Sequence, residues 1–167
     1  MREILFRGKT YDGKWVQGSL IKREIGCFIV DKNNQCALRK ATENLFDFES
    51  TLVIPKSVGQ YTGLTDKNGT KIFEGDIIRY AFGTDYEMYL ESLECPEEYE
   101  GADFSDLWTI DTVVYGIELG YPAFDLNNHE FECNGLAELS ESFLYYYEVI
   151  GNIHDNPELL ESEVDTE

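Results

Sequence analysis

Polar and apolar residues alternate along much of the first fifty residues, in short segments separated by turn-forming residues. The segment "WVQGSLI" (15–21) directs its side chains alternately to two faces, which is the period of a β-strand. The preceding "TYDGKW" supplies an Asp-Gly pair, a strong hairpin signal. "CFIV" (27–30) and "STLVIP" (50–55) have the apolar character of further short strands. Residues 1–54 are therefore predicted to form an antiparallel β-meander, in which residues 36–50 are ambiguous between strand and helical turn.

Turn chemistry is densest in the centre of the chain, in "VGQYTGLTDKNGTKIFEGDIIRY" (58–80). The tetrapeptide from Asp66 to Gly69 offers the positive-φ positions that a tight hairpin turn requires, and Gly75 allows a second sharp turn. The apolar "DIIRY" then continues as a buried strand. Short strands joined by closely spaced turns are what a small β-barrel needs in order to close its edges. Residues 55–155 are therefore predicted to form a second β-rich part, a small barrel.

A helical period interrupts this second part. Four apolar or aromatic side chains in "DYEMYLESLE" recur at the spacing of one helix face, and Pro96 ends the pattern. They are Tyr86, Tyr89, Leu90 and Leu93. The following "EEYEGADFSD" is acidic and loop-like, so residues 84–107 are predicted to be an insertion that is helical over 84–96. Strands resume in "LWTIDTVVYGIEL", "GLAELSESF" favours a short helix, and "YYYEVIGNI" is the last predicted strand before an acidic tail at 156–167.

Charge is distributed unevenly between the two parts. All thirteen Lys and Arg residues lie between Arg2 and Arg79, together with ten of the acids, so this half carries 13 − 10 = +3. The residues after Arg79 hold the other 23 acids and no cation, which gives −23 and, with the first half, the total of −20. A protein that grips a nucleic-acid backbone needs Lys and Arg to displace counterions. The second half is therefore not expected to bind nucleic acid.

The cysteines and the N-terminal residues predict a compartment. The N-terminal "MREILFRGK" is charged at four positions and holds no long apolar run, so no signal peptide is expected. No segment reaches the length of a transmembrane helix. The cysteines are unevenly spaced, without a C-x-x-C pair, at Cys27, Cys36, Cys95 and Cys133. Reduced thiols in a cytoplasmic protein are the expectation.

Two stretches suggest ligand chemistry and fail on their spacing. "GKT", beginning at Gly8, has the end of a phosphate loop, but the motif needs a glycine five residues earlier, where Glu3 stands. "HEFEC" places His129 and Cys133 on one side of a strand, with Glu130 and Glu132 beside them. A structural zinc site needs four ligands, and no second His or Cys lies nearby. A surface histidine and a buried cysteine are therefore favoured.

Paired carboxylates, such as Glu97 with Glu98, are frequent enough to arise by chance among 23 acids. A glycosidase would need two of them held across a cleft, with the pKa of one raised by burial. No activated nucleophile or base stands out. We therefore expect no catalysis, no metal and no cofactor.

Three stretches stand out at the two ends and in the centre of the chain. They are "FRGKTYDGKWVQGSLI" (6–21), "VIPKSVGQYTGLTDKNGTKIFEGDII" (53–78) and "YEVIGNIHDNPELL" (147–160). In this order they resemble the YopX family of bacteriophage and prophage proteins. The resemblance implies mainly β structure, with a C-terminal barrel similar to SH3-like barrels, and a phage or prophage protein in the bacterial cytoplasm. It implies no activity and no catalytic residue. The chain departs from the family's pattern in the extra length near 84–107 and in His154, where tyrosine is more usual.

Three functions remain open from the sequence. The favoured one is a small β-barrel that binds a protein partner, either a host protein or a second copy, without catalysis; it rests on fold analogy. The alternative is an acidic DNA mimic, a decoy whose carboxylates imitate DNA phosphates and occupy a host DNA-binding protein. Its support is the absence of Lys and Arg after Arg79, which a solubilising surface explains nearly as well. A nucleic-acid binder that uses the first half is the weakest, because that half carries only +3.

The uneven charge also predicts a homo-oligomer in which a basic patch of one copy faces an acidic surface of another. The basic residues are Lys14, Lys22 and Arg23, and the acidic residues are Glu97, Glu98 and Glu100. Apolar anchors would be needed as well, and Trp15, Phe28, Tyr145 and Tyr147 are the candidates. The run "FLYYY" (143–147) has only negative neighbours, so a core or a subunit interface is favoured for it over base stacking.

Overall fold

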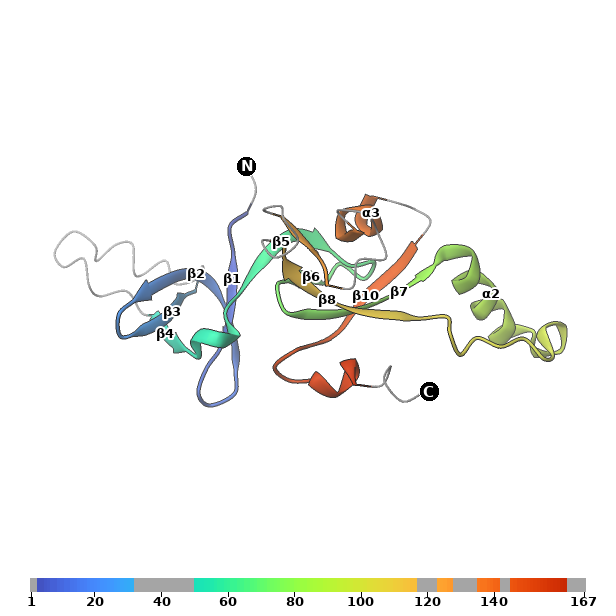
Figure 1. Cartoon of the computed structure of the whole chain (residues 1–167), viewed down its shortest axis with the longest axis horizontal. Helices are drawn as coiled ribbons and strands as arrows, with labels where there is room; N and C mark the ends of the chain where they lie inside the picture. The colour runs from blue at the N-terminus through green and yellow to red at the C-terminus, as the bar shows by residue number, and fades with distance from the viewer. Residues whose placement is uncertain (1–2, 32–49, 117–122, 128–134, 142–144, 162–167) are drawn as a thin grey trace. The chain divides into compact units, whose positions relative to one another are not determined.

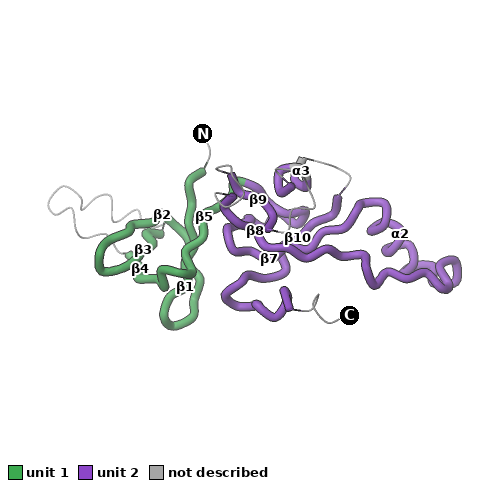
Figure 2. Tube along the Cα trace, viewed as in Figure 1, with its two compact units in different colours: residues 1–63 green, residues 64–167 purple. Residues whose placement is uncertain are grey.

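The protein is mainly β, as expected, with two antiparallel sheets in the computed structural model (Figure 1). The structure describes residues 3–31, 50–116, 123–127, 135–141 and 145–161. The chain divides into two compact units, residues 1–63 and 64–167 (Figure 2). None of the helices in the described ranges is both long and apolar enough to cross a membrane.

The first unit is the predicted meander. Its strands are β1 (Phe6–Lys9), β2 (Trp15–Arg23), β3 (Gly26–Val30), β4 (Ser50–Val53) and β5 (Gly59–Thr65). The first sheet has the order β4-β3-β2-β1-β5-β6, in which β6 is Lys71–Phe73. Strand β5 pairs with β1 along the edge opposite β2. The turn between β1 and β2 contains Gly13 at φ +87°, which confirms the Asp-Gly hairpin. Buried Cys27, Ile29 and Val53 form the core of this unit.

The compact units meet at residue 63, whereas the sequence-based division placed the boundary at residue 54. The intervening residues belong to the first unit because β1 holds them. The 3-10 helix η1 (Pro55–Ser57) brings Ser57 to the end of β1, where the Lys9 amide donates a hydrogen bond to Ser57 Oγ at 2.8 Å. Strand β5 then continues along β1, and a backbone pairing of this kind across fifty residues leaves no local signature in the sequence.

The second unit holds the remaining elements. They are β6 (Lys71–Phe73), β7 (Asp76–Phe82), α2 (Gly83–Glu94), η2 (Pro96–Tyr99), β8 (Thr109–Tyr115), β9 (Phe124–Leu126), α3 (Gly135–Glu141), β10 (Tyr145–Asn152) and η3 (Pro157–Leu160). Its sheet has the order β10-β7-β8-β9 with antiparallel pairs. The predicted helix in the insertion, the short helix near residue 135 and the last strand are all confirmed. Among the described strands no pair closes this sheet into the expected barrel.

One face of this sheet carries the core of the second unit. The buried side chains that form it are Ile72, Ile78, Tyr80, Val113, Leu126, Leu136, Leu139 and Tyr147. They come from the strands and from α3, whose first turn is tied to β9 by a hydrogen bond from the Leu136 amide to Asp125 Oδ1 at 3.1 Å. Residues 36–49, the stretch from His129 to Cys133 that was considered and rejected as a metal site, and residues 162–167 of the acidic tail lie outside the described ranges.

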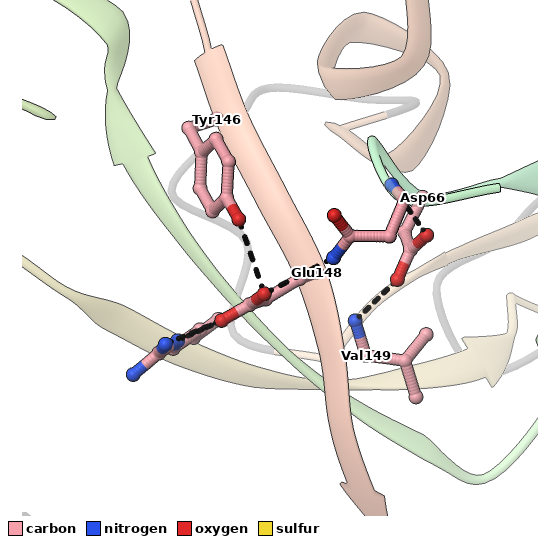
Figure 3. Close-up of polar contacts among 6 residues, drawn as sticks. Asp66, Tyr146, Glu148 and Val149 are labelled. Carbon is pink, nitrogen blue, oxygen red and sulfur yellow. Dashed lines mark hydrogen bonds and ion pairs between the residues drawn. The ribbon is translucent and has the colours of Figure 1, made fainter. Parts of the chain in front are cut away.

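The hairpin turn predicted at Asp66–Gly69 is confirmed, since the Asp66 amide donates to the carbonyl of Thr70 at 2.9 Å and Gly69 has φ +82°. The Asp66 side chain is only 5% exposed, and its two oxygens have separate partners. Oδ1 accepts from the amides of Asn68 and Thr70 at 2.9 and 2.8 Å. Oδ2 accepts from the amide of Val149 on β10 at 3.1 Å (Figure 3). One buried carboxylate therefore joins the hairpin to the last strand.

Candidate functional site

A long excursion leaves the second sheet between β7 and β8, and we call its residues 83–107 the acidic arm. The arm begins and ends on neighbouring strands, because Tyr80 of β7 and Thr109 of β8 are register partners. It consists of α2, η2 and a return loop, and Figure 1 shows α2 (yellow-green) projecting beyond the strands of this unit. The arm is thus an insertion into a β-hairpin, as the change of hydrophobic period predicted.

Aromatic contacts fix the base of the acidic arm to the face of the sheet opposite the core. Tyr86 of α2 stacks on Tyr146 of β10 with ring centroids 4.0 Å apart and an interplanar angle of 19°. Trp108, just before β8, meets Tyr86 edge-on at 5.4 Å and Tyr146 at 5.8 Å. Pairs of this kind contribute about 0.5–1.5 kcal/mol each beyond area burial. The first turns of α2 are therefore held on the sheet.

Glu148 is the polar centre beside this aromatic cluster (Figure 3). Its Oε1 accepts from Arg79 Nε at 2.6 Å and forms an ion pair with Arg79 Nη2. Its Oε2 accepts from Tyr146 Oη at 3.1 Å and from Asn68 Nδ2 at 3.2 Å. The Arg79 guanidinium also lies 4.3 Å from the Trp108 ring centroid, a cation–π distance. Both oxygens of Glu148 are used in holding the base of the arm.

The same surroundings change the acidity of one tyrosine. Burial, together with hydrogen bonds to Tyr86 and Glu148, raises the pKa of Tyr146 from 10.0 to about 12. The phenol is therefore protonated at neutral pH and acts as a hydrogen-bond donor rather than as a base.

Beyond its base, the acidic arm exposes apolar side chains. None of the 12 residues of α2 is buried, and Met88, Leu90 and Leu93 are 47%, 42% and 61% exposed. A helix of about 12 residues is marginal in water without packing partners, so three exposed apolar side chains on it are not explained by folding alone. The arm also carries nine Asp and Glu residues and no Lys or Arg. The arm therefore exposes apolar side chains among side chains that are all negatively charged or neutral.

Comparisons with known proteins place the chain in a family. A family model described as YopX protein matches residues 5–161, nearly the whole chain. The chain belongs to the YopX family. The YopX match includes the acidic arm as well as the three stretches that resembled the family. The crystal structure of protein EF1440 from Enterococcus faecalis is similar, with a TM-score of 0.51 and 20% sequence identity over 96% of this chain and 99% of that chain. At that identity the likeness concerns the fold alone. A comparison with curated proteins gave no match.

The YopX chain does not bring its three predicted basic residues together. Lys14 precedes β2 and Trp15 opens it, whereas Lys22 and Arg23 end it. A strand rises about 3.3 Å per residue, so the 22 − 14 = 8 steps between the two lysines correspond to about 26 Å. Lys14 forms an exposed ion pair with Asp12 at 2.8 Å instead. The three basic residues are close in the sequence but do not form one patch, because the extended strand β2 separates Lys14 from Lys22 and Arg23.

The predicted acidic residues do lie together in this YopX protein. Glu97 and Glu98 are part of η2, Glu100 follows directly, and all three are exposed on the acidic arm. The predicted aromatic anchors lie elsewhere. Tyr147 is 4% exposed in the core, where its hydroxyl donates to the Thr65 carbonyl at 2.9 Å. Tyr145, on the same face of β10, packs edge-on against Phe82 with centroids 5.3 Å apart.

Sequence reasoning missed the other face of β10 in the YopX chain. Tyr146 lies between the two core-facing tyrosines, and Glu148 follows two residues later on the same side. Side chains alternate between the two faces of a strand, so the prediction that Tyr145 and Tyr147 share one face already implied that Tyr146 lies on the other. The partners of this face could not be found in this way, since Arg79, which binds Glu148, is 69 residues from it in the sequence.

Buried carboxylates elsewhere serve the backbone. Asp66 accepts three amide hydrogen bonds, the amide of Phe73 donates to Asp76 Oδ2 at 2.7 Å, and the amide of Leu126 donates to Asp125 Oδ1 at 2.8 Å. Within the part of the chain that the structure describes, no group of three or more His, Cys, Asp or Glu side chains could hold a metal ion. These carboxylates have structural partners, whereas the acidic arm is a surface with features that folding does not explain.

Proposed function

We propose that this chain is a non-enzymatic interaction protein whose acidic arm binds the basic surface of a protein partner. The observation that carries the proposal is the combination on one helix of exposed Met88, Leu90 and Leu93 with a surrounding charge of −9. Apolar side chains supply the lasting contacts of an interface, and charge sets its orientation and partner choice. A basic surface with apolar pockets is complementary to both features.

The way the acidic arm is held supports this proposal. Tyr86 and Trp108 pack with Tyr146 at its base, so the start of α2 has a defined position before any partner arrives. Preorganisation reduces the conformational entropy that binding would otherwise remove. Membership of the YopX family supports a phage or prophage protein that works in a bacterial cytoplasm, where host proteins and further copies of the chain are the available partners.

A DNA mimic is the second candidate, and the absence of any Lys or Arg after Arg79 favours it. Both candidates bind a basic protein surface. They differ in the exposed apolar residues, which a mimic of phosphate groups does not need. Binding by a mimic would also compete with duplex DNA and fall steeply with salt.

Site-specific photo-crosslinking in a nuclease-treated bacterial lysate tests the proposal. A photoreactive residue at Leu93, 61% exposed on the arm, is compared with one at Tyr115, 38% exposed on β8 of the same unit. We expect Leu93 to crosslink to a basic protein and Tyr115 not to do so. Crosslinking that is equal at the two positions, or absent at Leu93, would contradict the proposal. Added duplex DNA separates the candidates, since it should abolish the crosslink of a DNA mimic and spare that of an interaction module.

Substituting Met88→Ser together with Leu90→Ser then tests the apolar contribution. The matched control is Glu97→Gln with Glu98→Gln, which lowers the charge of the arm and leaves the apolar side chains in place. If the chain is an interaction module, the serine variant should lose the Leu93 crosslink. If it is a DNA mimic, the glutamine variant should reduce the yield of this crosslink more than the serine variant does.

A further inference from the structure

The return loop of the acidic arm folds back on α2 and forms with it an open pocket of about 310 Å³. Its lining includes apolar Met88, Phe104 and Leu107, and carboxylates of Asp85, Asp103 and Asp106. Pockets for small molecules span roughly 300–1,000 Å³, so this one lies at the small end and suits a single side chain rather than an organic cofactor.

The helix and the loop hold the apolar wall of this pocket from two sides. Asp85 and Met88 are three residues apart on α2, so their side chains share one face of the helix. Across the pocket, the Phe104 ring packs edge-on against Tyr89 of α2 with centroids 5.6 Å apart. The Leu107 amide donates to the Phe104 carbonyl at 3.2 Å, which turns the chain beneath the pocket.

Within the described residues, the carboxylates of the pocket lack an ion-pair partner of opposite charge. The Ser105 amide donates to Asp103 Oδ1 at 2.9 Å, and this hydrogen bond lowers the pKa of Asp103. Among the described residues, no Lys or Arg forms an ion pair with Asp85, Asp103 or Asp106. The nearest basic residue before the arm in the sequence is Arg79, and its guanidinium is bound to Glu148.

We propose that this pocket binds an arginine side chain of the partner protein, an inference that rests on the proposed function and names the group recognised. Arginine combines an aliphatic stem, which suits the Met88 and Leu107 walls, with a planar cation that pairs with carboxylates. The guanidinium also stacks on aromatic faces, for which Phe104 is available, and this favours arginine over the compact ammonium of lysine.

The methyl group of Met88 is a selective reporter, because the chain's only other methionine is Met1. The full-length protein, labelled at the methionine methyls, is titrated with the peptide acetyl-Leu-Arg-Leu-amide while its NMR spectrum is recorded. The control peptide has citrulline, a neutral isostere, in place of arginine. We expect the Met88 signal to shift saturably with the arginine peptide and to stay unchanged with the citrulline peptide.

Charge variants locate the effect within the arm. Asp106→Asn and Asp85→Asn should each raise the Kd for the arginine peptide about two- to fivefold, the range of one exposed ion pair. Glu97→Gln and Glu98→Gln remove the same charge from η2, away from the pocket lining, and should leave the Kd nearly unchanged.

Several results would overturn the inference. They are an unmoved Met88 signal, an equal response to the citrulline peptide, and equal weakening by the pocket and the η2 substitutions. If the Met88 signal fails to respond while Leu93 still crosslinks to a basic protein, the pocket assignment is wrong and the proposed function stands. If the peptide binds and Leu93 crosslinks to nothing, the proposed function is wrong and the pocket assignment stands.

Discussion

Replacing Asp66 by alanine would remove three hydrogen bonds at once from the second unit. The two turn amides, of Asn68 and Thr70, belong to exposed residues and can bond to water in the variant. The amide of Val149 lies on half-buried β10 and is replaced less easily. The three bonds therefore do not contribute equally, and the bond to Val149 dominates the expected loss.

The magnitude follows from these differences. A hydrogen bond to a charged group contributes about 1.5–3 kcal/mol, which we assign in full to Val149. The turn pair is comparable with a helix N-cap, whose loss costs about 0.5–2 kcal/mol. The free energy of unfolding should therefore fall by about 3 kcal/mol. In a domain of about 100 residues each kcal/mol moves Tm by about 4–8 °C, so the second unit should melt roughly 12–24 °C lower.

Asp66→Asn is the matched control for this prediction. Asparagine keeps one oxygen for the two turn amides and places an amide donor opposite the Val149 N–H. The free energy of unfolding of Asp66→Asn should therefore lie between those of the wild type and Asp66→Ala, as measured by urea unfolding followed by circular dichroism. Hydrogen exchange should show faster exchange of the Val149 amide in both variants, and of the turn amides in the alanine variant. An unfolding free energy within about 1 kcal/mol of wild type for Asp66→Ala, or unchanged protection of Val149, would refute the reasoning.

Three further predictions concern other parts of the molecule. The pKa of Tyr146 is raised to about 12 in the folded protein, so the stability that this residue contributes is complete below pH 10 and is lost as pH passes through 12. The free energy of unfolding in urea should therefore depend less on pH across this range in Tyr146→Phe than in the wild type. Gly18→Ala would place a Cβ 1.9 Å from the Val30 carbonyl oxygen and should destabilise the first unit by about 1–3 kcal/mol. The loss should exceed that of Gly13→Ala, whose Cβ meets nothing within 4 Å and whose cost is confined to the backbone strain of φ +87°; equal effects in thermal melts would contradict this. Sedimentation equilibrium should show a homo-oligomer that weakens as salt rises and that Lys22→Glu disrupts more than Lys14→Glu, since Lys14 is already paired with Asp12; a monomer at both low and moderate salt would rule this out.

Local chemistry explains which elements the sequence could predict. The turn at Asp66–Gly69 needs a carboxylate and a glycine at fixed offsets, and both are visible in four residues. The helix of the acidic arm follows from a 3.6-residue period over a single stretch, so α2 was predicted within a few residues of its ends.

The candidate site depends on distant pairings, which explains why only part of it was predicted. The acids of the arm were identified because they are consecutive, as Glu97 and Glu98 show. The base of the arm was missed because Tyr86 meets Tyr146 only through the pairing of β7 with β10. Lys14 and Lys22 were grouped by sequence distance, although an extended strand places them far apart.

The pairing of β7 with β10 also sets the order in which a nascent chain can fold. The first sheet has all its strands once β6 (Lys71–Phe73) has been made, whereas Phe82 must wait for Tyr145. At about 5–20 residues per second, translation of the intervening segment takes roughly 3–13 s, during which one edge of β7 has no partner strand. Each unit holds one of the chain's two tryptophans, Trp15 and Trp108. Tryptophan fluorescence during refolding therefore reports on the two units separately, and Trp15→Phe isolates the signal of the second unit.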